Sequence, residues 1–256
     1  VTHNNGLGSV SGGTIVNVGA TLDLYSVTVG AEPITLAGGT LSDLTSSLLG
    51  SITLTADSTL NAESGDTLTL YGVISGAYGI NKTGAGTVVL ANVNTFTGTT
   101  VVSAGTLNVT GTLSDSTAVI VASGATYVVS AADTVASISG AGNITLSDRL
   151  TVGDSNDVTF SGAMSSIGGL TKVGSGTLTL SGSNSYTGST IVSAGRLSLG
   201  ANNVLSNSSA LTITGGIFDI GVYSDTVGTI SLSSGTINGT TGVLTGSAYN
   251  ITNSSG

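Results

Sequence analysis

The feature that most restricts the fold of this chain is a long internal repeat. Residues 79–110 (GINKTGAGTVVLANVNTFTGTTVVSAGTLNVT) align without a gap with residues 169–200 (GLTKVGSGTLTLSGSNSYTGSTIVSAGRLSLG), and nearly half of the aligned positions are identical. The match resumes further along with an offset of 92 residues, where LSDSTAV at 113–119 meets LSNSSAL at 205–211. A repeat of this length indicates a protein built by stacking similar structural units.

The local pattern inside and around the two copies has a period of two. In SITLTA, Ile52 and Leu54 alternate with Thr53 and Thr55, and TLTL occurs twice more. Apolar side chains that alternate with Thr or Ser predict short strands with one buried and one solvated face. Gly, Asn, Asp and Ser between these strands predict turns. No stretch of ten or more residues has helical spacing, so we expect an all-β protein.

Two architectures could use such strands, a β-sandwich and a parallel β-helix. A sandwich is disfavoured because the hairpin dipeptide Asn-Gly occurs only at Asn5-Gly6 and Asn238-Gly239, and because aromatic residues make up only 4% of the chain. In a parallel β-helix each strand pairs with the equivalent strand one coil before and one coil after, and aliphatic side chains fill a narrow interior. With roughly 18–25 residues per coil, we predict a β-solenoid of about a dozen coils.

The repeat also predicts an organisation along the chain. We expect one β-solenoid over residues 1–256, with divergent N-terminal coils at 1–71, a first repeat at 72–161 and a second repeat at 162–251. Since the chain begins at Val1 and no basic-then-apolar leader follows, we interpret it as a mature product or as a piece excised from a longer polypeptide.

The charge of the chain excludes several partners. Charged residues are 7% of the sequence, and the net charge is −9. Without a basic patch, binding to nucleic acid or to an anionic membrane surface is disfavoured, and no apolar run is long enough for a membrane helix. The absence of Cys excludes disulfides and thiolate metal sites. Because a charged side chain turned inward is costly, we interpret the scarcity of charge as a consequence of packing.

The two aligned copies resemble the autotransporter-associated β-strand repeat of bacterial surface proteins. The second copy carries that family's pattern at Gly169, Leu170, Lys172, Gly174, Gly176, Leu178, Leu180, Asn184, Tyr186, Gly188, Thr190, Gly195 and Leu197. The first copy carries it from Lys82 to Leu107, with Phe96 in place of the tyrosine. The resemblance implies a right-handed parallel β-helix that is exported to the bacterial surface. Members of the family are adhesins, self-associating passengers or plain stalks.

Residues that could carry nucleophilic chemistry are few. His3 is the only histidine, and its place near the terminus predicts a solvated side chain. A Ser-Lys pair could in principle use Lys82 or Lys172, but both lysines stand at matching repeat positions. We therefore interpret them as solvated or corner-capping residues.

Acidic residues offer the other possible chemistry. Asp154 with Asp157, or Glu63 with Asp66, could form a glycosidase pair. A lyase would add a basic residue such as Arg149. Both acidic pairs lie in Gly/Ser/Asn-rich corners, where Asp normally caps a turn. We predict no catalytic, cofactor-binding or metal-binding residue, no cofactor and no enzymatic activity.

The function that these observations favour is structural. We expect a rigid extracellular passenger or stalk on the bacterial surface, used for display, adhesion or self-association, with itself or host and cell-surface molecules as partners. A second hypothesis is a filament subunit that stacks head to tail, because the ends of a solenoid present unpaired edges and the sequence shows no capping helix or charged rim. A carbohydrate-active β-helix enzyme is the minor alternative.

Overall fold

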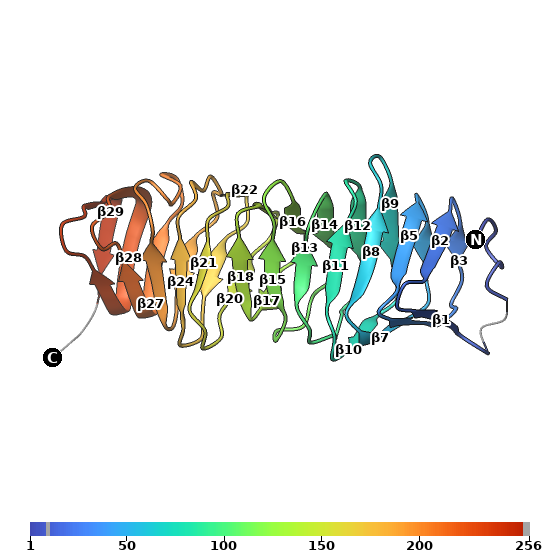
Figure 1. Cartoon of the computed structure of the whole chain (residues 1–256). Coiled ribbons are helices and arrows are strands. Elements are labelled where there is room, and N and C mark those ends of the chain that lie inside the picture. The colour runs from blue at the N-terminus through green and yellow to red at the C-terminus, as the bar shows by residue number, and fades with distance from the viewer. Residues whose placement is uncertain (9–10, 253–256) are drawn as a thin grey trace. The chain divides into compact units, whose positions relative to one another are not determined.

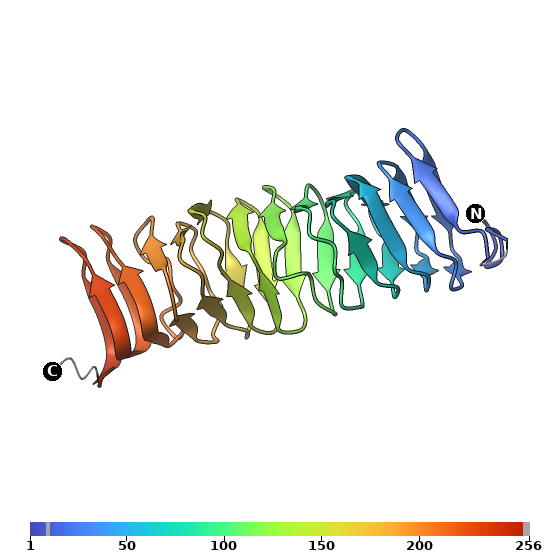
Figure 2. The same cartoon turned by 90° about the horizontal axis from the view of Figure 1, so that it is seen from below.

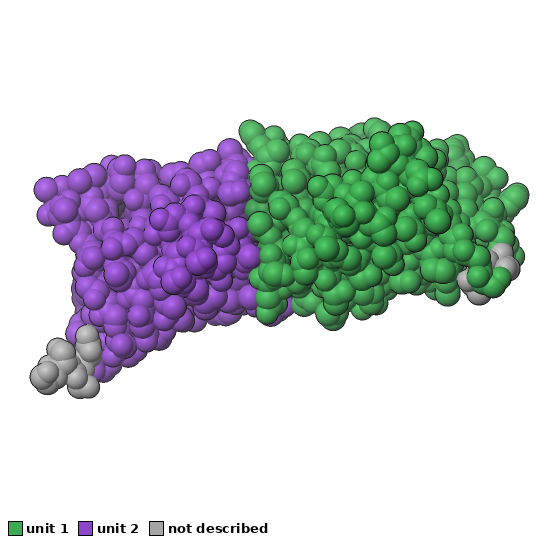
Figure 3. All heavy atoms as spheres, turned by 60° about the horizontal axis from the view of Figure 1, so that its bottom comes forward, with its two compact units in different colours: residues 1–131 green, residues 132–256 purple. Residues whose placement is uncertain are grey.

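A computed structural model describes residues 1–8 and 11–252, which form strands and turns and no helix. It confirms the all-β prediction and the β-solenoid, with about 13 turns in total. The described residues contain no helical segment with the length and hydrophobicity of a membrane span. The chain forms two compact units, residues 1–131 (unit 1) and 132–256 (unit 2), coloured separately in Figure 3. The three-part division expected from the repeat, with boundaries at 71/72 and 161/162, stays a prediction.

Unit 1 consists of three parallel sheets (Figure 1). Each of the first four coils contributes one strand to each sheet, and the later coils contribute to the second and third sheets only. The first sheet contains β1 (Thr14–Asn17), β4 (Ile34–Ala37), β7 (Ile52–Ala56) and β10 (Ile74–Gly76). The second contains β2 (Thr21–Tyr25), β5 (Thr40–Leu44), β8 (Ser58–Ala62), β11 (Ile80–Thr83), β13 (Thr100–Val102) and β15 (Ala118–Val121). The third contains β3 (Thr28–Val29), β6 (Ser47–Leu48), β9 (Thr67–Leu70), β12 (Thr87–Leu90), β14 (Thr106–Val109) and β16 (Thr126–Val129).

The register of these sheets gives the length of a coil. In the first sheet Thr14 pairs with Ile34, Ile34 with Ile52, and Ile52 with Ile74. One coil therefore takes 18 to 22 residues, within the range expected from the sequence. Figure 2 shows the strands of unit 1 side by side from below.

Unit 2 repeats this plan with the same parallel pairing. One sheet contains β17 (Asp133–Val135), β20 (Leu150–Val152), β23 (Leu170–Lys172) and β25 (Thr190–Val192). A second contains β18 (Ser137–Gly140), β21 (Val158–Phe160), β24 (Thr177–Leu180) and β26 (Arg196–Leu199). A short third sheet pairs β19 (Asn143–Leu146) with β22 (Met164–Ser165). Three longer strands complete the unit: β27 (Leu211–Asp219), β28 (Asp225–Asn238) and β29 (Leu244–Ile251).

The buried core of each unit is made of ladders of like residues. In unit 1, Leu68, Val88, Leu107 and Tyr127 pair in register on four successive coils, and each is 0% exposed. Full burial of an aliphatic side chain of this size is worth about 1.5–3 kcal/mol. Next to this ladder, Thr67, Thr87, Thr106 and Thr126 pair in register on the half-buried outer face of the same strands. The period-two pattern of the sequence thus becomes an apolar column inside and hydroxyl rows outside.

Candidate functional site

The two copies of the repeat place the same lysine inside the solenoid. Lys82 pairs in register with Leu60 and Val102, and its side chain is 0% exposed. Lys172 takes the corresponding place in unit 2, between Val152 and Val192, and is 2% exposed. Each lysine therefore replaces one aliphatic rung of an inward ladder.

The buried ammonium group caps the corner that follows its strand. Lys82 Nζ donates to the carbonyl oxygens of Thr83 at 2.7 Å, Gly84 at 2.8 Å and Ala104 at 3.2 Å. Ala104 lies one coil further along, so the cation joins two turns of the solenoid. Lys172 Nζ donates in the same way to the carbonyls of Val173 and Gly174.

These contacts confirm corner capping and correct the expectation of a solvated lysine. The methylene stem packs like an aliphatic residue, and charge-assisted hydrogen bonds to carbonyls replace the hydration of the ammonium group. An inward charge is thus tolerated here without a carboxylate partner at salt-bridge distance among the described residues, where the only ion pair joins Arg196 and Asp219.

Burial of Lys82 predicts a pH dependence of stability. Loss of hydration lowers the pKa of Lys82 from 10.5 to about 8, against the opposing charge of Glu63. Between these values the unfolded chain binds one proton more than the folded chain. We therefore expect the free energy of unfolding to rise from pH 8 towards pH 10, by up to about 2 kcal/mol. Urea unfolding across this range would measure the slope, and Lys82→Met should reduce it; a fall in stability over the same range would contradict the assignment.

A repeated asparagine forms a second bridge between coils. Asn184 is 5% exposed, and its Oδ1 accepts the backbone N–H of Met164 at 2.7 Å, one coil earlier. Its Nδ2 donates to the carbonyls of Gly182 at 3.1 Å and Val204 at 2.9 Å, the latter one coil later. Asn94 repeats the arrangement in unit 1, where it is 2% exposed. One amide side chain thus connects three successive turns.

The carboxylate of Asp225 extends this bridge in unit 2. Its Oδ2 accepts the N–H groups of Val204 at 3.1 Å and Leu205 at 2.8 Å, and its Oδ1 accepts that of Thr226 at 2.8 Å. Burial raises the pKa of Asp225 because it removes hydration, and the three N–H donors oppose that shift. Sequence reasoning did not single out this residue, because DTV at 225–227 has the pattern of an ordinary strand start.

An aromatic residue fills the interior beside each asparagine, but the two copies differ. Tyr186 and Phe96 are both 0% exposed. The Tyr186 hydroxyl lies 2.6 Å from Thr190 Oγ1, and burial raises the pKa of Tyr186 to about 12, which keeps it neutral. In unit 1 the phenylalanine offers no hydroxyl, and Thr100 Oγ1, at the equivalent position, is buried without a hydrogen-bond partner.

This difference predicts a stabilising substitution. Phe96→Tyr should supply the missing partner of Thr100 and raise the free energy of unfolding by about 1 kcal/mol. Hydrogen exchange of the β13 amides would measure the gain. In a Thr100→Val background the same substitution should bring no gain, since no hydroxyl remains to be satisfied. An equal gain in both backgrounds would contradict the proposed hydrogen bond.

A repeated glycine brings neighbouring coils into close contact. A Cβ at Gly98 would lie 2.1 Å from the carbonyl carbon of Tyr78, and one at Gly188 would lie 2.3 Å from the carbonyl oxygen of Gly168. Both neighbours are backbone atoms, so no side chain can move aside. The inward lysine, the bridging asparagine and this glycine are therefore all residues that join one coil to the next.

The inward lysine, the bridging asparagine and the close-packed glycine of each copy lie in two segments that match a known family. Residues 80–109 and 170–199 match the model of the family described as Passenger-associated-transport-repeat. The resemblance to autotransporter passenger repeats is confirmed. Together the two passenger repeats cover less than a quarter of the chain. No curated protein and no solved structure shows a significant match.

Of the acids considered for catalysis in unit 2, Asp154 makes a contact typical of a turn and Asp157 makes a contact with the next coil. Asp154 Oδ1 accepts the N–H of Asn156 at 2.7 Å, and Asp157 Oδ1 accepts that of Thr177 at 2.7 Å. The latter contact lowers the pKa of Asp157. Arg149 forms its hydrogen bonds with Thr171 and Ser189 instead of these acids.

The acids considered for catalysis in unit 1 also accept hydrogen bonds from neighbouring side chains. Glu63 Oε1 accepts from Asn61 Nδ2 at 2.9 Å, while Asp66 Oδ1 accepts from the hydroxyl of Thr45 at 3.2 Å. His3 is exposed. Across residues 1–8 and 11–252 no group of three or more His, Cys, Asp or Glu side chains is arranged to hold a metal ion.

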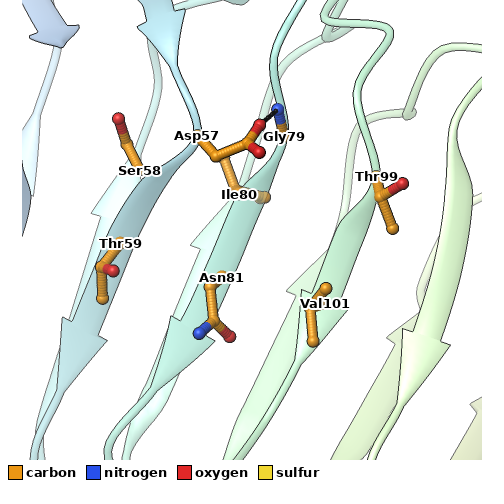
Figure 4. A pocket seen from close by; sticks show the side chains of 8 residues that line it. All are labelled: Asp57, Ser58, Thr59, Gly79, Ile80, Asn81, Thr99 and Val101. Atoms are coloured by element: carbon orange, nitrogen blue, oxygen red, sulfur yellow. Dashed lines mark hydrogen bonds between the residues drawn. The ribbon is translucent and has the colours of Figure 1, made fainter. Parts of the chain in front are cut away.

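Two depressions mark the surface of unit 1. The larger, of about 380 Å³, crosses three coils of the second sheet (Figure 4) and is lined by Asp57, Ser58, Thr59, Gly79, Ile80, Asn81, Thr99 and Val101. The second, of about 320 Å³, is lined by Ser26, Val27, Thr28, Thr45, Ser46, Ser47, Thr67, Thr69 and Tyr71. Hydroxyl groups dominate the second, the first has a mixed polar and apolar lining, and of the two only the first is lined by a carboxylate, that of Asp57.

Proposed function

We propose that the chain is a structural, non-enzymatic passenger segment that is displayed on the bacterial surface as a rigid β-solenoid stalk. Its passenger repeats and its β-solenoid both fit an autotransporter passenger domain. The observation that carries the proposal is the structural role of the residues that the two copies share. Lys82, Asn94 and Gly98, like their counterparts in the second copy, are buried or in close backbone contact and hold successive coils together.

Surface display has a direct test. Cells that carry the full gene would be labelled with an antibody raised against this segment and treated with an external protease. We expect intact cells to be labelled and the label to be lost after proteolysis, while a periplasmic control protein survives. Labelling of permeabilised cells alone would overturn the proposal.

Self-association in a filament is the second candidate, because the edge strands of a solenoid present unpaired backbone groups. Negative-stain electron microscopy of the purified chain would separate the two roles. Isolated short particles support the stalk, and fibres that lengthen with protein concentration support head-to-tail stacking.

A further inference from the structure

The larger depression on unit 1, lined by Asp57, Gly79, Asn81 and Thr99 among others, is called the groove below. The corresponding place in unit 2 is occupied by the side chain of Arg149. Asp57 directly precedes β8, and Arg149 directly precedes β20. The next residue donates its N–H to the same repeat glycine in both units: Ser58 to Gly79 O at 3.2 Å, and Leu150 to Gly169 O at 2.9 Å. Asp57 and Arg149 therefore occupy equivalent positions and carry opposite charges.

In unit 2 the guanidinium of Arg149 binds along the neighbouring coils. Its Nη1 donates to Thr171 Oγ1 at 3.1 Å and to the carbonyl oxygen of Ser189 at 3.5 Å. Its Nη2 donates to Ser189 Oγ at 3.0 Å. The outer surface of this corner of the repeat thus accepts a guanidinium through three oxygen atoms on two successive coils.

In unit 1 Asp57 takes the place of the arginine, and two of the corresponding acceptors already have partners. Asn81 Oδ1 accepts from Ser103 Oγ at 2.6 Å, and the carbonyl oxygen of Thr99 accepts the N–H of Ile80 at 3.0 Å, while the Thr99 residue itself is exposed. By register, Asn81 stands for Thr171 and Thr99 precedes β13 as Ser189 precedes β25. Asp57 Oδ1 accepts the N–H of Gly79 at 2.7 Å, which fixes the carboxylate on the rim of the groove (Figure 4). Its Oδ2 has no protein partner within the described part of the chain. The groove therefore combines the exposed hydroxyl of Thr99 with the negative charge of Asp57.

We propose that this groove binds an arginine side chain presented by a partner protein. A guanidinium on the rim would meet the carboxylate of Asp57 in a charge-assisted contact and donate to the hydroxyl of Thr99, the counterpart of Ser189. The net charge of −9 would also attract a basic partner.

A second copy of this chain is a poor source of that side chain. Within residues 1–8 and 11–252, Arg149 lies on its own coils and Arg196 is paired with Asp219 at 2.5 Å. Lys82 and Lys172 are buried and hydrogen bonded to carbonyls. The arginine therefore comes from a different protein, and the inference stands independently of surface display.

The test is an NMR titration of the isotope-labelled chain at low salt. The probe is a short peptide with blocked termini whose only charged side chain is one arginine. The matched control peptide carries citrulline instead, which keeps the shape and removes the charge. We expect saturable shifts of the amides of Gly79, Asn81 and Val101 with the arginine peptide only. Equal shifts with the citrulline peptide, or shifts spread over the surface without saturation, would overturn the proposal.

Two variants sharpen the assignment. Asp57→Asn should weaken binding at least about fivefold, because it removes the charge and keeps an acceptor for Gly79. Asp57→Arg should abolish binding, because the new side chain would occupy the groove as Arg149 does. Asp115→Asn, which changes the charge equally at an exposed loop position, is the control and should bind as the parent does. Undiminished binding in both Asp57 variants, with the rest of the spectrum unchanged, would refute the site.

Discussion

Asn184→Leu should lower the free energy of unfolding of unit 2 by about 3–5 kcal/mol. Leucine has the same number and branching of side-chain heavy atoms as asparagine but is somewhat larger, so most of the loss comes from hydrogen bonds and a smaller part from overpacking. The N–H of Met164 loses its acceptor, and the carbonyls of Gly182 and Val204 lose their side-chain donor. Each buried polar group without a partner costs about 1–3 kcal/mol.

Urea unfolding followed by circular dichroism would give the overall change, and hydrogen exchange would locate it. We expect the amides of β22 and β25 to lose protection first. Asn207→Leu, at an exposed position between strands, is the matched control and should change stability by less than about 0.5 kcal/mol. Similar losses in the two variants would show that the amide bridge contributes nothing specific.

Gly98→Ala should destabilise unit 1 by more than about 3 kcal/mol, because overpacking against backbone exceeds the usual cost of an extra methyl group. The new Cβ would lie 2.1 Å from the carbonyl carbon of Tyr78 and 2.2 Å from the nitrogen of Gly79. Only a displacement of the preceding coil could relieve this contact. That displacement would also disturb the groove that Gly79 lines.

The control for this substitution is Gly30→Ala, since a Cβ at Gly30 would meet nothing within 4 Å. Denaturant midpoints of the two variants give the comparison. We expect Gly30→Ala to match the parent or exceed it slightly, because alanine restricts the unfolded chain. If Gly98→Ala were equally stable, the close approach of the coils at this corner would have to be wrong.

The strands and their pairing could be predicted because one rule governs them. Alternation such as Ile52-Thr53-Leu54 defines the inward face, and the repeat defines which residues stack. The same alternation also placed Lys172 inward, two residues after Leu170. Alternation alone does not predict an inward lysine, because an inward charge is normally costly. The sequence could not show that carbonyls of two successive coils, those of Thr83 and Gly84 and that of Ala104, would receive the ammonium group of Lys82.

The sequence alignment could not reveal that Asp57 and Arg149 occupy equivalent positions. The ungapped match begins at Gly79 and Gly169, one coil after these residues, and the preceding coil differs in length by two residues. Only the register of β8 with β11 and of β20 with β23 aligns them. Opposite charges at one position also hide the relation from any comparison based on residue similarity.

The nearly uniform sequence separation between paired strands has a consequence for how the chain folds. Strand partners in unit 1 are separated by only 18 to 22 residues, although parallel sheets usually join distant segments and form slowly. Each newly added turn here closes a loop of the same modest size, at nearly the same entropic cost. Folding can therefore advance turn by turn from any formed neighbour, with a contact order closer to that of a helical bundle than to that of a β-sandwich.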